Sequence, residues 1–178
     1  MRDREIRSPE DLRGLKIRVS GAAAAEAIEA LGATPVQLPI TQVYNGLQTG
    51  LIDGLVSGAS VMSDFKLDEV VGTMSLGANL GRLSFFTVMN KAAYDGLPDE
   101  AKAALDTEMR AELSRRAEEA WIATADAGIE AARASDRTTV IDLTEDEIAA
   151  FDAALSPVTD AYIAQVGGEA ALAAMRGQ

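Results

Sequence analysis

The sequence contains no cysteine and no histidine. The missing cysteine excludes disulfides, thiolate metal sites and cysteine nucleophiles. The missing histidine removes the commonest general base and the commonest metal ligand. Aromatic residues make up only 4% of the chain, so we expect a core of small and aliphatic side chains. The enzyme hypothesis for this sequence is therefore one that uses paired carboxylates.

Basic residues are scarce relative to acidic ones. The 178 residues include 16 Lys and Arg against 28 Asp and Glu, which gives a formal net charge of −12 at pH 7. Nucleic-acid binding needs a basic patch that attracts phosphate, so this charge argues against it. The acidic clusters at Asp53, Asp68-Glu69 and Asp99-Glu100 lack calcium-loop spacing. We therefore predict no metal site and no cofactor.

Long apolar runs are also absent. No run approaches the roughly 20 residues that cross a bilayer. The segment after Met1, RDREIRSPED, is polar and lacks the apolar centre of a signal peptide. The length is that of one domain, large enough to bury a core. Taken alone, these features would place a soluble protein in the cytosol.

Strand-like and helix-like segments alternate in the first third of the chain. Ser8-Pro9-Glu10-Asp11 is typical of a helix start, and residues 15–20 alternate between apolar and polar as a strand does. An alanine-rich helix then runs from Gly21 to Gly32, and a short strand covers residues 34–38. This order and spacing predict an α/β fold with a parallel-type sheet flanked by helices.

The stretch TQVYNGLQTGLIDGLVSGAS, residues 41–60, has the pattern of a ligand-binding sheet edge. We expect Thr41 to cap a helix that Gly50 ends in the left-handed conformation. Asp53-Gly54 then turns the chain into a short strand at Leu55-Val56. The small residues of SGAS follow, and they leave space where open α/β sheets bind ligands.

The second half is predicted to be mostly helical. We expect a helix over residues 61–71, a glycine-punctuated segment over 72–81 and a strand over 83–90, LSFFTVMN. A helical pattern then runs from Pro98 to about Ser135, with an apolar stripe that includes Met109 and Trp121 as expected core residues. This helix would span roughly 50 Å, so it must lie across two bodies or bend near residues 125–128.

The last segment of the chain is predicted to be a strand followed by a helix. Residues 138–143 read as the strand, and Thr144 with Glu147 forms a capping box at the start of the helix. We expect Pro157 to kink or interrupt this helix, because proline cannot donate a helix hydrogen bond.

Several motifs together resemble one family. VYNGLQTGLIDG resembles the E-x-Y-x-A-L-Q-x-G-x-x-D-G signature of the substrate-binding proteins of TRAP transporters, the DctP-like family. SPEDLRGLKIRVSG is similar to its P-E-D-L-K-G-L-K-I-R-V-P-G, and LGATPVQLPITQVY to its L-G-A-x-P-x-x-L-P-x-x-E-V-Y. Downstream, FKLDEV, FFTVMNKAAYDGLPDEAK and GGEAALAAM also match. Several motifs in the right order are much more specific than any one of them.

The resemblance implies a periplasmic-binding-protein-like lobe with a long interlobe helix. Proteins of this family carry a signal peptide and a first lobe before the motif that here begins at Ser8. We therefore expect residues 1–82 and 124–178 to form the C-terminal lobe. Residues 83–123 would be a hinge strand and long helix that belong mainly to the first lobe, an N-terminal lobe that is otherwise largely missing. The full-length protein is then expected in the periplasm.

Arg18 is the most informative single residue for function. Its guanidinium lies near the C-terminal end of a predicted inner strand, and burying it costs several kcal/mol unless an anion pairs with it. A carboxylate is the natural bidentate partner. The residues alone leave open an edge-strand arginine that faces solvent or pairs with a helix acid. The resemblance implies that Arg18 clamps the carboxylate of the substrate.

The resemblance also implies four further ligand-binding positions. Ser57 stands where the family has an asparagine, and Ala59 where it has a tryptophan, so the pocket wall is smaller than the family pattern. Ile40 matches a position that is often an aromatic packed on the ligand. Gly21 matches a position where a ligand-contacting asparagine can occur.

Three functional hypotheses follow. The favoured one is the solute-binding component of a TRAP-type transporter, which binds a small organic acid through its carboxylate and delivers it to a membrane permease. The second is a truncated lobe that acts as an interaction domain without ligand. The third is a carboxylate-based enzyme, for which Asp53 is the only acid expected at the C-terminal end of a strand. Arg18 inside a concave cleft would support the first hypothesis, and Arg18 on a flat solvent face the second.

Overall fold

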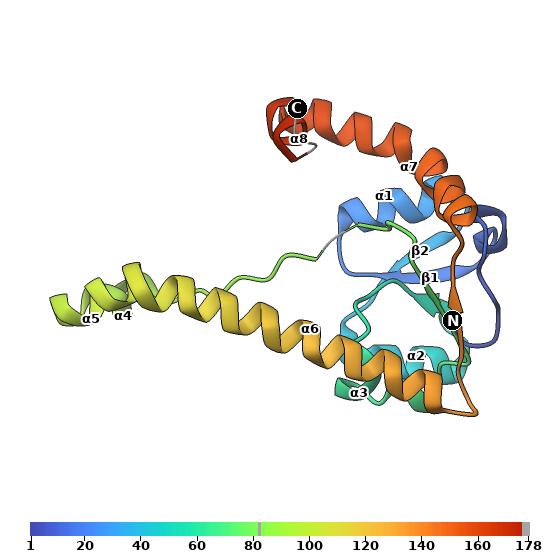
Figure 1. Ribbon diagram of the computed structural model, residues 1–178, viewed down its shortest axis with the longest axis horizontal. Helices are drawn as coiled ribbons and strands as arrows, with labels where there is room; N and C mark the ends of the chain where they lie inside the picture. Colours follow the sequence, from blue (N-terminus) through green and yellow to red (C-terminus); the bar gives the residue numbers. More distant parts are fainter. Residues whose placement is uncertain (82, 176–178) are drawn as a thin grey trace.

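The computed structural model describes residues 1–81 and 83–175, apart from the side chain of Glu108. Its strands form two parallel sheets (Figure 1). The first sheet has the order β2-β1-β3, with β1 Lys16–Val19, β2 Thr34–Gln37 and β3 Gly54–Leu55. The second pairs β4 Thr73–Leu76 with β5 Thr139–Asp142. The predicted α/β fold with parallel sheets is confirmed.

Helices surround and extend from these sheets. The α-helices of the described chain are α1 Ala22–Ala30, α2 Val43–Thr49, α3 Val61–Asp64, α4 Lys91–Asp95, α5 Asp99–Ala104, α6 Arg110–Ala134, α7 Glu145–Val166 and α8 Glu169–Met175. Short 3-10 turns occupy η1 Pro9–Leu12, η2 Ile40–Gln42 and η3 Leu67–Glu69, and a π-helical turn, η4 Leu105–Met109, joins α5 to α6.

Two clusters of buried side chains form the core. One lies between β1, α1 and α7 and includes Val19, Ile28 and Phe151. The other lies beneath α2 and α3 and includes Leu47 and Met62. Burying a side chain of this size contributes about 1.5–3 kcal/mol relative to leaving it exposed. Both clusters are mainly aliphatic, as the low aromatic content predicts.

The first six residues join the two sheets. The amide of Arg2 donates to the carbonyl oxygen of Asp53, just before β3, at 3.0 Å. On the other side, the hydroxyl of Ser75 in β4 donates to the carbonyl oxygen of Ile6 at 2.6 Å. This extended segment therefore holds β3 and β4 within one body.

The long helix is confirmed. α5, the π-helical turn and α6 continue one another from Asp99 to Ala134, and Figure 1 shows them projecting well beyond the sheets without a bend at residues 125–128. Met109 and Trp121 are 54% and 43% exposed, so the prediction that they belong to the core is wrong. Neither residue belongs to the two buried clusters of the described chain.

The predicted strand over residues 83–90 is wrong. The segment is extended but forms no strand, and Phe85, Phe86 and Val88 are exposed. Its β-like composition has no effect here, because a strand requires a neighbour for its backbone hydrogen bonds and the described chain offers it none. The glycine-punctuated segment 72–81, by contrast, contains β4, which pairs with β5.

Several helix boundaries also differ from expectation. The helix predicted over 61–71 ends at Asp64, and Lys66 adopts a left-handed φ of 53° before η3. Thr41 lies within η2 and does not cap α2, although Gly50 ends α2 at φ 74° as predicted. Pro157 lies inside α7 without ending it.

None of the helices in the described chain combines the length with the apolar composition that crossing a membrane requires.

Candidate ligand-binding pocket

Arg18 is a buried cation on the central strand of the first sheet. It lies in register with Val36 of β2 and Leu55 of β3, and the residue is only 7% exposed. This placement rules out an edge-strand arginine that faces solvent. Parallel neighbours on both sides hold the backbone, so the sheet sets the direction in which the side chain leaves the strand.

One hydrogen bond orients the guanidinium. Its Nε donates to the carbonyl oxygen of Leu38 at 2.8 Å, at the turn that follows β2. No carboxylate of the described residues forms an ion pair with Arg18, so the Nη groups stay available. Burial lowers the pKa of Arg18, but an arginine remains charged at neutral pH. The result is a fixed, uncompensated positive charge.

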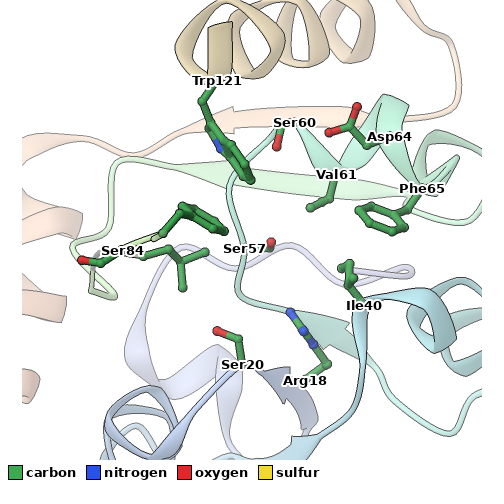
Figure 2. Close-up of a pocket in the computed structure, with 12 residues that line it drawn as sticks. Arg18, Ser20, Ile40, Ser57, Ser60, Val61, Asp64, Phe65, Ser84 and Trp121 are labelled. Carbon is green, nitrogen blue, oxygen red and sulfur yellow. The ribbon is translucent and has the colours of Figure 1, made fainter. Parts of the chain in front are cut away.

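Arg18 lies at one end of a pocket with a volume of about 360 Å³ (Figure 2). Its polar lining consists of Arg18, Ser20, Ser57, Ser60, Asp64 and Ser84. Its apolar lining consists of Ile40, Val61, Phe65, Leu83, Phe85 and Trp121. A mostly apolar cavity with a few polar groups is typical of small-molecule sites.

Three of the five predicted site residues meet here. Arg18, Ile40 and Ser57 line the pocket, from β1, the start of η2 and the loop after β3. Gly21 and Ala59 are not among the lining residues. Gly21 precedes α1 with open space where a Cβ would be, and Ala59 packs its backbone against α6. Direct ligand contact by any of the five remains a prediction.

The small residues after β3 let α6 approach the pocket. A Cβ built at Gly58 would lie 3.6 Å from the indole nitrogen of Trp121. The Trp121 ring in turn packs on Phe85, with ring centroids 4.1 Å apart and planes tilted by 33°. A Cβ at position 58 would therefore be in van der Waals contact with the indole, and a larger side chain would compete with it for space.

Sequence reasoning missed several lining residues. Trp121 reads as part of an apolar helix stripe, and Phe85 as part of a strand, so neither pattern indicates a pocket. Ser60 is the last residue of the predicted ligand loop, and Asp64 and Phe65 follow it closely in the sequence. That proximity is the one signal in the sequence that could have found them.

Asp53 has a structural function. Its carboxylate accepts a hydrogen bond from the amide of Lys16 at 2.8 Å, and its own amide donates to the carbonyl oxygen of Lys16 at the same distance. These bonds fix the start of β3 against β1. Within the described ranges, no three acidic side chains are grouped so that they could hold a metal ion.

Comparison of the sequence with known proteins gives the same family as the motifs do. Residues 2–165 match the family model of DctP, described as bacterial extracellular solute-binding protein, family 7. The chain is 33% identical over 162 residues to the C4-dicarboxylate-binding periplasmic protein DctP of Rhodobacter capsulatus. The aligned region covers 90% of this chain and 48% of that protein.

Solved structures agree with this match. The periplasmic ectoine-binding protein of the TeaABC TRAP transporter of Halomonas elongata superposes with a TM-score of 0.76 at 31% identity, over 93% of this chain and 53% of that one. A TRAP periplasmic solute-binding protein of Bordetella bronchiseptica, with bound mandelate, reaches a TM-score of 0.84 over 99% of this chain and 57% of that one. At 24% identity, it supports the fold alone.

The chain spans about half the length of the relatives that it matches. These relatives are named as periplasmic solute-binding proteins and not as enzymes. The family model nevertheless covers nearly all of the chain, and the fold and the motifs agree with it. The chain belongs to family 7 of the bacterial extracellular solute-binding proteins, the DctP family.

Proposed function

We propose that this chain forms the carboxylate-binding lobe of a TRAP-type solute receptor for a small organic acid. The observation that carries the proposal is the buried charge of Arg18, which faces a cavity without an ion-pair partner among the described residues. Burying an unpaired charge costs several kcal/mol, and a bound carboxylate would offset that cost. The two Nη groups would accept the carboxylate as a bidentate pair.

The relatives support this class of ligand. Similar proteins are named for C4-dicarboxylate and ectoine binding, and both ligands carry a carboxylate. In the complete receptor, two lobes would close on the acid and then deliver it to a membrane permease. This activity belongs in the periplasm, where the named relatives act. No catalytic group is required, because the receptor changes only the location of its ligand.

The division into lobes is part of the proposal. Residues 1–82 and 124–178 form the binding lobe, and residues 83–123 belong mainly to the other lobe of a two-lobe receptor. Phe85, Phe86, Met109 and Leu113 support this division, because all four are exposed apolar side chains on the projecting segment. Large exposed patches of this kind mark interaction surfaces.

The charge of Arg18 provides the test. Phenylacetate would be titrated into the protein, and binding would be followed by NMR. The reporters are the Nε–H signal of Arg18 and the single indole N–H signal of Trp121. Binding by one lobe should be weak, with Kd in the millimolar range. Arg18→Met should abolish saturable shifts of the Trp121 signal, and Arg18→Lys should restore only part of the affinity, because an ammonium cannot form the forked pair.

Exposed Arg13 supplies the matched control, since its ion pair with Glu10 is long, at 3.7 Å. Arg13→Met should leave the titration unchanged. Arg18→Met should fold at least as stably as the parent, because it removes an uncompensated buried charge. An Arg18→Met variant that binds phenylacetate with unchanged affinity would exclude the proposed function.

A further inference from the structure

Ser60 carries an unpaired hydroxyl at the wall of the pocket. The residue is 2% exposed, and its Oγ is the one buried side-chain polar atom of the described chain that has no hydrogen-bond partner. Leaving such a group unpaired costs about 1–3 kcal/mol. Buried polar groups in proteins are nearly always paired, so this exception requires a reason.

The local backbone explains why the hydroxyl is unused. Ser60 precedes α3, where a serine normally accepts a hydrogen bond from a backbone amide of the first helical turn. That geometry requires an extended backbone, whereas Ser60 has helical angles, φ −54° and ψ −28°. The side chain therefore makes no cap. Figure 2 shows the hydroxyl directed toward Ser57 and the interior of the pocket.

Apolar side chains line much of the pocket between Ser60 and Arg18, and Ser57 also lies between them. Figure 2 places these two residues at opposite ends, with Ile40, Val61 and Phe65 along one side and Trp121 along the other. The body of a ligand held by Arg18 therefore lies between walls that are largely apolar before the ligand reaches Ser60. A flat or ring-shaped body suits a wall that contains aromatic rings.

The charges of the lining favour a single carboxylate. Among the described lining residues, Arg18 is the only cation and Asp64 the only anion. One carboxylate neutralises Arg18, whereas a second one would meet Asp64 near the end where Ser60 lies. Like charges at close range repel, so a neutral polar group is the better partner there.

We propose that Ser60 selects the ligand of this pocket. The ligand is a monocarboxylate with an apolar, ring-sized body and a hydroxyl or carbonyl oxygen at the end distant from its carboxylate. That oxygen forms a hydrogen bond with the Ser60 hydroxyl. This inference rests on the proposed function, because Arg18 must hold the carboxylate at the other end.

The inference is tested by adding a hydroxyl group to the ligand and by removing the hydroxyl group of Ser60, separately and together. The probes are 4-hydroxyphenylacetate and 3-hydroxyphenylacetate against phenylacetate, each titrated by NMR into the parent chain and into Ser60→Ala. At least one hydroxylated acid should bind the parent about fivefold more tightly than phenylacetate, as one net hydrogen bond predicts. In Ser60→Ala this preference should disappear, while the affinity for phenylacetate stays the same.

Neighbouring Ser63 supplies the control, because its hydroxyl already donates to the carbonyl oxygen of Ser60 at 3.2 Å. Ser63→Ala should keep the preference for the hydroxylated acid. Ser60→Ala should also be as stable as the parent or more stable, since it removes an unpaired group. A merely structural serine would instead lose stability.

The outcomes separate the two proposals. If phenylacetate binding depends on Arg18 but Ser60→Ala leaves the hydroxyl preference intact, the inference about Ser60 is overturned and the proposed function stands. A parent chain that binds all three acids equally also overturns the inference. If no acid binds in a manner that depends on Arg18, the proposed function falls, and this inference falls with it.

Discussion

Gly128 of helix α6 lies directly against the carbonyl oxygen of Ala59 in the pocket loop. A Cβ built at position 128 would lie only 2.7 Å from that oxygen, closer than real Cβ contacts occur. Gly128 and Trp121 are seven residues apart, which places them on the same face of α6. The absence of a side chain at position 128 therefore allows Trp121 to reach the pocket.

Gly128→Ala should destabilise the protein by about 1–3 kcal/mol, because the obstacle is backbone and cannot rotate away. Helix propensity alone predicts the opposite sign, a gain of about 1 kcal/mol. Urea denaturation provides the measurement. Ala123→Gly, at an exposed site of the same helix, is the control and should cost about 1 kcal/mol through propensity alone. A stabilised Gly128→Ala variant would show that the contact is not rigid.

Asp64→Asn should change the discrimination between diacids and monoacids. Removing the negative charge should raise the affinity for glutarate relative to pentanoate by about two- to fivefold, and added salt should reduce the difference. NMR titration of both acids into the parent and the variant gives this ratio. Asp68→Asn, which removes a charge outside the lining, is the control. An unchanged ratio would mean that Asp64 does not face the bound ligand.

The segment of residues 83–90 should exchange its amide hydrogens rapidly. It has no strand partner in the described chain, and Phe85, Phe86 and Val88 are exposed, so little protects its backbone. Hydrogen exchange read by mass spectrometry should show protection in β1 and near-complete exchange in this segment. Strong protection of residues 83–90 in a monomer would contradict the division into lobes.

Asp11 should make the stability depend on pH in the acid range. Its carboxylate accepts hydrogen bonds from the amides of Arg7 at 2.9 Å and Ser8 at 2.8 Å, which lower its pKa. Because the folded pKa lies below the unfolded value, this stabilisation is complete above about pH 4 and is lost as the pH falls through the folded pKa.

Asp11→Asn should therefore lower the free energy of unfolding at pH 7 by about 1 kcal/mol or less. The difference from the parent should shrink as the pH falls below about 4, as urea denaturation at several pH values would measure. Glu10→Gln is the matched control, because Glu10 makes only a long, exposed ion pair. A difference that stays constant down to low pH would exclude this linkage.

The sequence predicted the elements whose signals are local. Alternation over residues 15–20 located β1, and the glycine at position 50 located the end of α2. The capping box at Thr144 located the start of α7. Residues 83–90 gave an equally clear local signal that the structure overrode, and Pro157 does not interrupt α7. A strand needs a partner that local composition does not supply, and a long helix can tolerate one missing hydrogen bond.

The amino-acid sequence by itself determined the family, the parallel α/β order and Arg18 as the residue to examine, because these depend on motifs and on periodicity along the chain. Only the tertiary structure decided which side chains surround Arg18. The pocket draws Ser60 from the loop after β3, Phe85 from the segment before α4 and Trp121 from α6. These residues are distant in sequence; the approach of Gly128 to Ala59 brings α6 to the loop, and the contact between Phe85 and Trp121 adds the segment before α4. The unpaired Ser60 hydroxyl has the same origin, since burial and missing partners exist only in three dimensions.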